Sequence, residues 1–134
     1  YKAAEGFTLA FQNGWDKEAY TNGKIWQVAT LRPGKYRLEV TYAYTMVVSD
    51  AGNFISALMA KGNSESDIPN VADIEQLNGV CAIYDKAGTN DDSGILVTPS
   101  FEVTETTDVV IGFLTSLAKG NSYFKVTELK LILE

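Results

Sequence analysis

Three aromatic residues near the N-terminus are the side chains best suited to contact a ligand. Trp15, Tyr20 and Trp26 lie close together, and the turn-forming pairs Asn13–Gly14 and Asn22–Gly23 flank them. An exposed aromatic ring offers a flat apolar face that can stack on a sugar ring. Trp is also highly buried on average, so each ring has a second interpretation as core. We expect one Trp to be core and the other exposed, with Trp15 as the exposed one because a turn directly precedes it.

Two loops carry the oxygen ligands that a hard cation such as Ca²⁺ prefers. Asp50 and Asn53 lie in the first loop, and Asp91 and Asp92 lie in the second. Neither loop matches the pattern of an EF-hand, and Asp and Asn are also the residues that ordinary turns require. These four residues are candidate ligands of a structural calcium ion. No other cofactor is expected.

Catalysis lacks its usual residues, because the chain contains no histidine. Histidine is the commonest general base and the usual partner of a nucleophilic serine or cysteine. Two facing carboxylates would be enough for a glycosidase, but Glu39 and Glu102 fall on the polar faces of predicted strands and most other acids lie in loops. No glycine motif that binds phosphate is present. We therefore expect no enzymatic activity.

Length and charge narrow the class of partner. The 134 residues carry a formal net charge of -6, which disfavours nucleic acid and anionic membrane surfaces. Residues 1–134 are expected to form a single domain, since 46% of the residues are hydrophobic. No apolar stretch approaches the ~20 residues that span a bilayer, so no membrane insertion is expected. The start at Tyr1 suggests a mature product or one module of a longer protein, and the lone Cys81 predicts no intrachain disulfide.

The elements that position these residues are predicted to be strands. Apolar and polar residues alternate from Tyr36 to Tyr44 and again from Val97 to Val103, which is the period of a half-buried strand. Residues 24–31 are rich in β-formers, and the turn Arg32–Lys35 predicts a hairpin between them and 36–44. Residues 97–103 are predicted to form a second hairpin with 108–114, in which Pro99 indicates an edge strand or a bulge.

Further segments complete the predicted fold. Residues 7–11, 53–60 and 123–133 are predicted strands, the last with a bulge near Glu128. On that last strand Leu129, Leu131 and Leu133 are placed on one face, and Phe124, Val126 and Ile132 on the other. Helical spacing from Ile74 through Tyr84 predicts a short helix over about residues 71–77. Residues 85–94 are the longest predicted loop. The chain is thus predicted to be all-β, an antiparallel β-sandwich of the jelly-roll type with about eight strands and one short helix.

The parity of the strands also predicts which side chains form the core. The inward-facing residues are expected to be Leu31, Tyr36, Leu38, Val40, Phe101, Val103, Ile111, Phe113, Leu129 and Leu131.

Three segments carry a resemblance to a known group of modules: GKIWQVATLRPGKYRLEVTY, SFEVTETTDVVIGFL and YFKVTELKLIL. Their shared features are Gln27 before an alternating strand, Pro33, Gly34 and Tyr36 at a turn, a corner at Thr104–Thr107, and a final strand with Phe124, Val126, Leu129 and Leu131. With these the chain resembles the galactose-binding-domain-like β-sandwiches. It is similar to uncharacterised C-terminal modules of secreted and outer-membrane lipoproteins of glycan utilisation from Bacteroidetes.

The resemblance implies a secreted or cell-surface location, an occasional structural calcium ion, and binding to a glycan or polysaccharide beside other domains of the parent protein. The residues that carry it specify a fold, so no sugar-binding residue follows from it. Three hypotheses result. The first is a non-catalytic carbohydrate-binding module that uses Trp15, Tyr20 and Trp26. The second is a structural or protein-docking module without sugar binding, and the third is a small glycosidase.

Overall fold

The structure is a computed structural model that describes residues 9–13, 20–45, 53–86, 92–117 and 122–134. Within them the chain forms nine strands and two 3₁₀ segments. In chain order these are β1 (Leu9–Asn13), β2 (Tyr20–Leu31), β3 (Gly34–Thr45), β4 (Phe54–Lys61), η1 (Glu65–Asp67), η2 (Val71–Gln76), β5 (Gly79–Ile83), β6 (Asp92–Val97), β7 (Phe101–Val103), β8 (Thr107–Leu117) and β9 (Ser122–Leu133).

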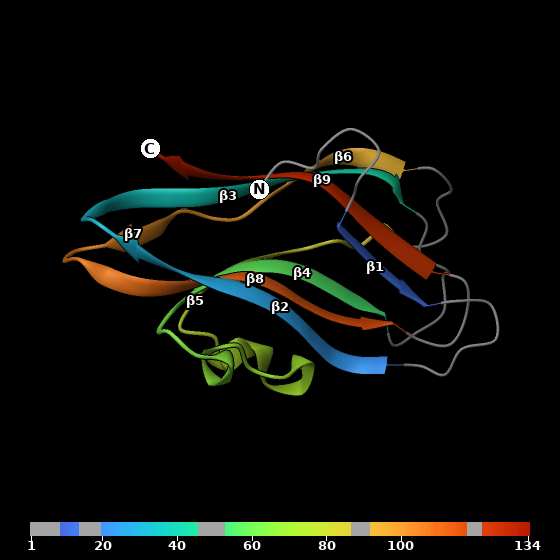
Figure 1. Ribbon diagram of the computed structural model, residues 1–134, viewed down its shortest axis with the longest axis horizontal. Helices are drawn as coiled ribbons and strands as arrows, with labels where there is room; N and C mark the ends of the chain where they lie inside the picture. Colours follow the sequence, from blue (N-terminus) through green and yellow to red (C-terminus); the bar gives the residue numbers. More distant parts are fainter. Residues whose placement is uncertain (1–8, 14–19, 46–52, 87–91, 118–121) are drawn as a thin grey trace.

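The strands stack as two antiparallel sheets (Figure 1). The β3 sheet has the order β1-β9-β3-β6, with the short β7 also paired to β3. The β8 sheet has the order β2-β8-β4-β5. The two 3₁₀ segments lie outside the sandwich, against the β8 sheet (Figure 1). The predicted fold class, an all-β antiparallel sandwich, is confirmed.

The core lies between the sheets, where strand parity predicted it. All of the predicted core residues are buried except Leu129 and Leu131, which are half-buried and pack against the buried clusters. A smaller cluster around Leu58, Ile68 and Leu114 lies on the outer face of the β8 sheet, under the 3₁₀ segments. Burial of the outer face in this region explains why β8 is buried on both sides from Val109 to Leu117.

Both predicted hairpins are wrong, because each predicted turn is a corner at which the chain changes sheets. β2 pairs with β8 in one sheet, and β3 pairs with β6, β7 and β9 in the other. The two corners lie side by side, since Leu31 is opposite Thr107 and Gly34 is opposite Val103. The chain therefore bends from one sheet into the other at two adjacent corners, one between β2 and β3 and one between β7 and β8. Bending buries the alternating apolar faces of both sheets against each other, which a flat hairpin cannot do.

Pro99 lies where the predicted edge strand is interrupted, between β6 and β7. The neighbouring Thr98 replaces the missing ladder contacts on the edge of β3. The Leu38 N–H donates a hydrogen bond to the Thr98 hydroxyl oxygen (2.9 Å), and the Thr98 N–H donates one to the Leu38 carbonyl oxygen (3.1 Å). The prediction that Pro99 marks an edge or a bulge is confirmed.

The last strand contains the bulge predicted near Glu128. Its register against β3 shifts between the pairs Thr41–Glu128 and Tyr42–Val126. Because a bulge adds one residue, it reverses strand parity, so Phe124 and Val126 face the same core as Leu129. The assignment of Phe124 and Val126 to the opposite face is therefore wrong.

The predicted helix is present only as 3₁₀ structure over Val71–Gln76. The helical spacing did not extend further, since Gly79–Ile83 is the strand β5, paired to β4. Gly79 fits there because a Cβ at this position would collide with the backbone of Met59. Two boundaries also move: β1 spans residues 9–13 instead of 7–11, of which 7 and 8 lie outside the described residues, and β6 begins at Asp92 inside the predicted loop.

Candidate ligand-binding surface

The candidate surface is built on β2, one of the two edge strands of the described β8 sheet. A bulge near its start sets which side chains face outward. Asn22 has a positive φ of 56°, and the register against β8 shifts between Tyr20 and Gly23. Asn is one of the few residues that adopt this left-handed conformation readily. The shift reverses the parity of the strand, so Tyr20 and Trp26 face opposite sides despite their even spacing.

Tyr20 faces the interior. It packs against the core cluster around Tyr42 and Phe124, and its hydroxyl shares a 3.1 Å hydrogen bond with the Thr115 hydroxyl. Burial raises the pKa of Tyr20 above its ordinary value, against the smaller lowering by Thr115. The structure therefore does not bring Tyr20 and Trp26 together on one surface. Trp15 lies outside the described residues.

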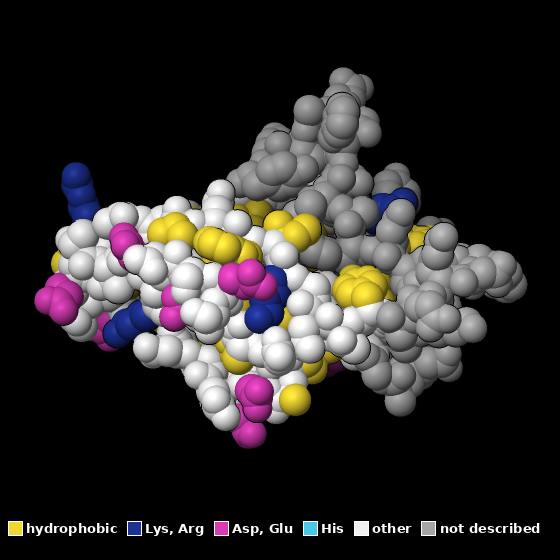
Figure 2. All heavy atoms as spheres, turned by 60° about the horizontal axis from the view of Figure 1, so that its bottom comes forward, with side chains coloured by type: hydrophobic (Ala, Val, Ile, Leu, Met, Phe, Trp, Pro, Cys, Tyr) yellow, Lys and Arg dark blue, Asp and Glu magenta, His cyan; other side chains and the backbone are white. Residues whose placement is uncertain are grey.

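Trp26 faces outward and is 38% exposed. It lies opposite Gly112 of β8, which has no side chain, and beside Val28, which is 43% exposed. The expectation that Trp26 is the core member of the two Trp residues is wrong, because the outer face of an edge strand is only partly covered. Figure 2, which turns the lower side of Figure 1 toward the viewer, shows hydrophobic side chains spaced along this side among polar ones.

The segment between η1 and η2 is fixed beside the start of β2. The Asn22 side-chain oxygen accepts a hydrogen bond from the Val71 N–H (2.8 Å), and the Lys24 ammonium donates one to the Ile68 carbonyl oxygen (2.8 Å). The Asn22 N–H in turn donates to the Ser116 hydroxyl of β8 (2.9 Å). These contacts connect the start of β2 both to β8 and to the segment around η2.

Polar groups lie farther along the same outer face. Thr30 shares the parity of Trp26 and Val28, and its hydroxyl donates a 2.7 Å hydrogen bond to the exposed Asp108 carboxylate. Thr30 lies four residue steps along the strand from Trp26, which is roughly 13 Å. The face therefore offers an aromatic ring at one end and a hydroxyl with a carboxylate at the other.

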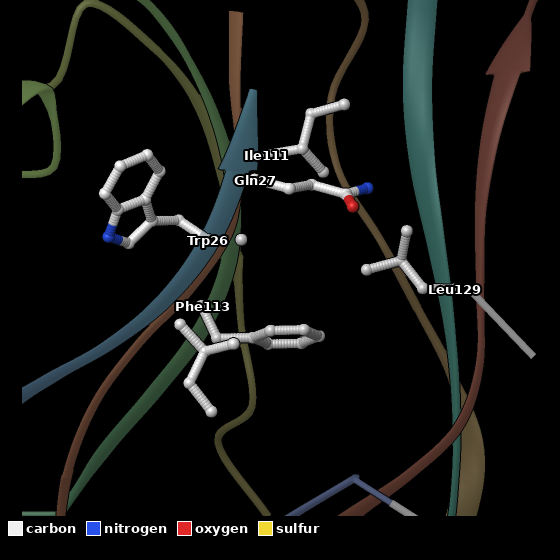
Figure 3. A pocket seen from close by; sticks show the side chains of 7 residues that line it. Trp26, Gln27, Ile111, Phe113 and Leu129 are labelled. Atoms are coloured by element: carbon white, nitrogen blue, oxygen red, sulfur yellow. The ribbon is translucent and has the colours of Figure 1, made fainter. Parts of the chain in front are cut away.

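The inward side of β2 opens into a cleft between the sheets. Its volume is about 250 Å³, and it is lined by Ile25, Trp26, Gln27, Ile111, Gly112, Phe113 and Leu129. In Figure 3 the Gln27, Ile111 and Phe113 side chains extend toward Leu129 on β9, whereas the Trp26 ring points to the opposite side of the strand. The lining carries no charged group and one amide, so a ligand with many hydroxyls would leave most of them without partners here.

Of the four candidate calcium ligands, the described residues include Asn53 and Asp92. Asn53 directly precedes β4, and Asp92 begins β6. One oxygen of Asp92 accepts a 2.8 Å hydrogen bond from the Tyr84 hydroxyl, and burial together with Asp92 raises the pKa of Tyr84. Asp50 and Asp91 lie outside the described residues. Among the described ones no three His, Cys, Asp or Glu side chains are grouped as a metal site.

A comparison with protein families assigns the chain to one of them. Residues 1–112 match the family described as "Domain of unknown function (DUF5013)". The chain belongs to this family. The match to the DUF5013 domain includes all of β2 and ends within β8. No curated protein and no solved structure matches the chain. In the described part of the DUF5013 domain, no helix has the length and apolar character needed to cross a membrane.

Sequence reasoning missed two exposed apolar residues of β2 in the DUF5013 domain. Val28 and Ile25 are exposed on opposite faces of β2, although both are apolar. The apolar residues on both faces of 24–31 were the signal that could have identified them. A strand with apolar residues on both faces either has both faces buried or has a face available for a partner. Only the sheet order shows that β2 is an edge strand.

Proposed function

We propose that this DUF5013 domain is a non-catalytic binding module that captures a carbohydrate on the outer face of β2. The observation that carries the proposal is Trp26, an indole 38% exposed on a strand that is hydrogen-bonded along its length to the central strand β8. One side of a pyranose ring presents C–H groups, which an aromatic face covers without a need for hydrogen bonds.

The chemistry along the face fits an elongated ligand. Trp26 and Val28 supply apolar contact, and the exposed Thr30 and Asp108 pair supplies a hydroxyl and a carboxylate for sugar hydroxyls. The roughly 13 Å between Trp26 and Thr30 is long enough for more than one sugar unit. An oligosaccharide or polysaccharide is therefore a better candidate than a free monosaccharide.

The sequence resemblance to known β-sandwich modules supports the same proposal. The chain resembles galactose-binding-domain-like jelly rolls, and modules of that kind occur in secreted and outer-membrane lipoproteins from Bacteroidetes. We therefore place the domain, as part of the proposal, on a secreted or cell-surface protein whose other domains lie beside it.

Retention on immobilised polysaccharides tests the proposal. The wild-type domain should be retarded on at least one plant, mucin or host glycan in an affinity gel, and Trp26→Ala should remove the retardation. Loss of such a ring commonly costs more than about 1 kcal/mol of binding. Asp108→Ala should weaken binding without removing the aromatic contact.

The matched control is Ile95→Ala, which removes an exposed apolar side chain, 60% exposed, from the edge of the other sheet. This variant should bind as the wild type does. Thermal melts accompany each variant, with Phe113→Ala as the reference for a core loss of about 3–5 kcal/mol. Absence of retention of the wild type on every glycan, with the fold intact, would contradict the proposal.

A protein-docking or structural module is the second candidate. It is favoured by the apolar residues on both faces of β2, Ile25 at 44% and Val28 at 43% exposed, which resemble the centre of an interface more than a sugar site. If the domain has this function, Trp26→Ala should weaken association with a purified neighbouring domain of the parent protein. Neither the wild type nor the variant should then be retained on any glycan.

A further inference from the structure

We propose that the free edge of β2 pairs with β2 of a second copy of this domain, forming a two-fold antiparallel dimer with Gln27 on the axis. The inference goes beyond the proposed function, because it concerns association between copies and needs no carbohydrate.

The first argument is that this edge is unguarded. Within the part of the chain that the structure describes, β2 pairs with β8 on one side only. Edge strands are normally protected by charges, proline or bulges, but Ile25 through Leu31 contains none of these. The one charge of β2, on Lys24, is directed to the Ile68 carbonyl oxygen of the flanking segment.

The second argument is that both faces of the edge are apolar and exposed. Ile25 is 44% exposed on the inward face, and Trp26 and Val28 are 38% and 43% exposed on the outward face. A ligand that lies on one face covers only one of these sets. A strand covers both, because its own side chains alternate between the two faces.

The third argument is that β2 complements itself in one register. With Gln27 on the axis, Trp26 lies across from the partner's Val28, and Ile25 across from the partner's Ala29. The two Gln27 amides meet each other, and each amide has both a donor and an acceptor. Within one copy the Gln27 side chain is exposed and extends from β2 toward Leu129 (Figure 3).

Charge selects this register over its neighbours. With Gln27 on the axis, Lys24 lies across from the partner's uncharged Thr30, one strand away from the Asp108 carboxylate to which that hydroxyl donates, so no like charges face each other. With Val28 on the axis, Lys24 would instead lie across from the partner's Arg32, and like charges opposite each other are destabilising. With Trp26 on the axis, Lys24 would lie across from the partner's Val28 and gain no partner.

The pairing keeps the outer faces of the two β8 sheets on one side. The two Trp26 residues become diagonal neighbours, with Cβ atoms roughly 7–8 Å apart. The dimer therefore presents two indoles on one continuous sheet. A single edge contact of this kind falls near the lower limit of specific interfaces, about 1,200 Å² in total, so association is expected to be reversible.

Sedimentation equilibrium of the domain alone, from micromolar to near-millimolar concentration, tests the dimer. The wild type should show a monomer–dimer equilibrium. Gln27→Lys places two like charges on the axis and should raise the dissociation constant about tenfold or more. The matched control is Ile95→Lys, which places a charge at an exposed position on β6, at the edge of the β3 sheet. It should leave the dissociation constant unchanged. A wild type that stays monomeric throughout, or a dimer that Ile95→Lys disrupts and Gln27→Lys does not, would overturn the proposal.

Cross-linking tests the register independently. In a Cys81→Ala background, Gln27→Cys should form an intermolecular disulfide under mild oxidation, because opposite Cα atoms lie about 4.5–5.5 Å apart. Val28→Cys should not form one, because the Cα atoms of the two introduced cysteines would lie farther apart than the roughly 7 Å that a disulfide can bridge. Cross-linking at position 28 with none at 27 would contradict the register. None of these measurements includes a glycan, so their failure and the failure of glycan retention are separate results.

Discussion

Trp26 on the edge strand lies directly opposite Gly112 on the central strand β8, and Leu58 of β4 lies on the other side of the same glycine. Gly112 therefore occupies the middle of a row that crosses three strands. A Cβ on Gly112 would overlap the Ile25 carbonyl oxygen and would lie 2.8 Å from the Trp26 Cα atom. Both are backbone positions of a paired strand, so they cannot move aside as a side-chain tip can.

We predict that Gly112→Ala lowers the free energy of unfolding by about 1–3 kcal/mol, the usual cost of overpacking. Urea denaturation followed by circular dichroism measures it. The control is Gly94→Ala, where the new Cβ meets the Tyr42 hydroxyl oxygen at 2.8 Å, the far end of a side chain. It should cost less. Equal losses in the two variants would show that the Trp26 strand can shift away from β8.

Thr98→Val tests the side chain that stands in for a ladder contact at the interrupted edge. The Leu38 N–H is buried and donates to the Thr98 hydroxyl oxygen, so the nearly isosteric valine leaves this donor unsatisfied. The expected loss of stability is about 1–3 kcal/mol. Thr30→Val removes an exposed hydroxyl that donates to Asp108 and should change stability by less than about 0.5 kcal/mol. Chemical denaturation of the two variants compares the loss of a buried hydrogen bond with the loss of an exposed one. A smaller loss of stability for Thr98→Val than for Thr30→Val would contradict the role of the Thr98 hydroxyl as the acceptor for the Leu38 N–H.

Stability at high pH should depend on Tyr84. Burial, followed by the hydrogen bond to Asp92 and the charge of Asp92, holds the pKa of Tyr84 above its ordinary value of 10.0. Above the ordinary value the unfolded chain releases this proton while the folded chain keeps it. The free energy of unfolding therefore falls as the pH rises beyond 10, the ordinary pKa. Below that pH the contribution is fully present.

Tyr84→Phe keeps the ring among Tyr42 and Phe124 and removes the titrating hydroxyl. We expect lower stability than the wild type at neutral pH, by about 1.5–3 kcal/mol for a hydrogen bond to a charged group. The further decline above the ordinary tyrosine pKa should become shallower. Denaturation curves across the alkaline range measure both effects, and parallel pH profiles for wild type and variant would exclude Tyr84 as the group responsible.

Calcium should have little effect on the melting temperature. Asp92, one of the candidate ligands, already has an oxygen engaged by the Tyr84 hydroxyl at 2.8 Å. Melts with EDTA and with added Ca²⁺ should therefore agree closely. A large increase with Ca²⁺ that Mg²⁺ does not reproduce would instead identify a calcium site and direct attention to the loops of Asp50 and Asp91.

The sequence by itself determined the properties that depend on neighbouring residues. Alternation along Tyr36, Leu38 and Val40 placed these side chains in the core, because successive side chains of any strand point to opposite faces. Proline chemistry placed Pro99 at an edge, since proline has no N–H to give to a ladder. Fold class followed from the number of such strands.

Only the tertiary structure decided which strands pair and which side chains meet. The corner at residues 32–34 looks locally like a hairpin turn, but β2 finds its partner in β8 and β3 finds its partners elsewhere. The bulges at Asn22 and near Glu128 reverse strand parity through pairing with another strand. At Asn22 this turns the half-buried Tyr20 toward the interior and leaves Trp26 exposed. Pairing energy is non-local, because it depends on residues distant in the sequence. Local pattern therefore specifies the alternation within each uninterrupted strand segment, and the assembled sheets specify which face is covered and which surface the domain presents.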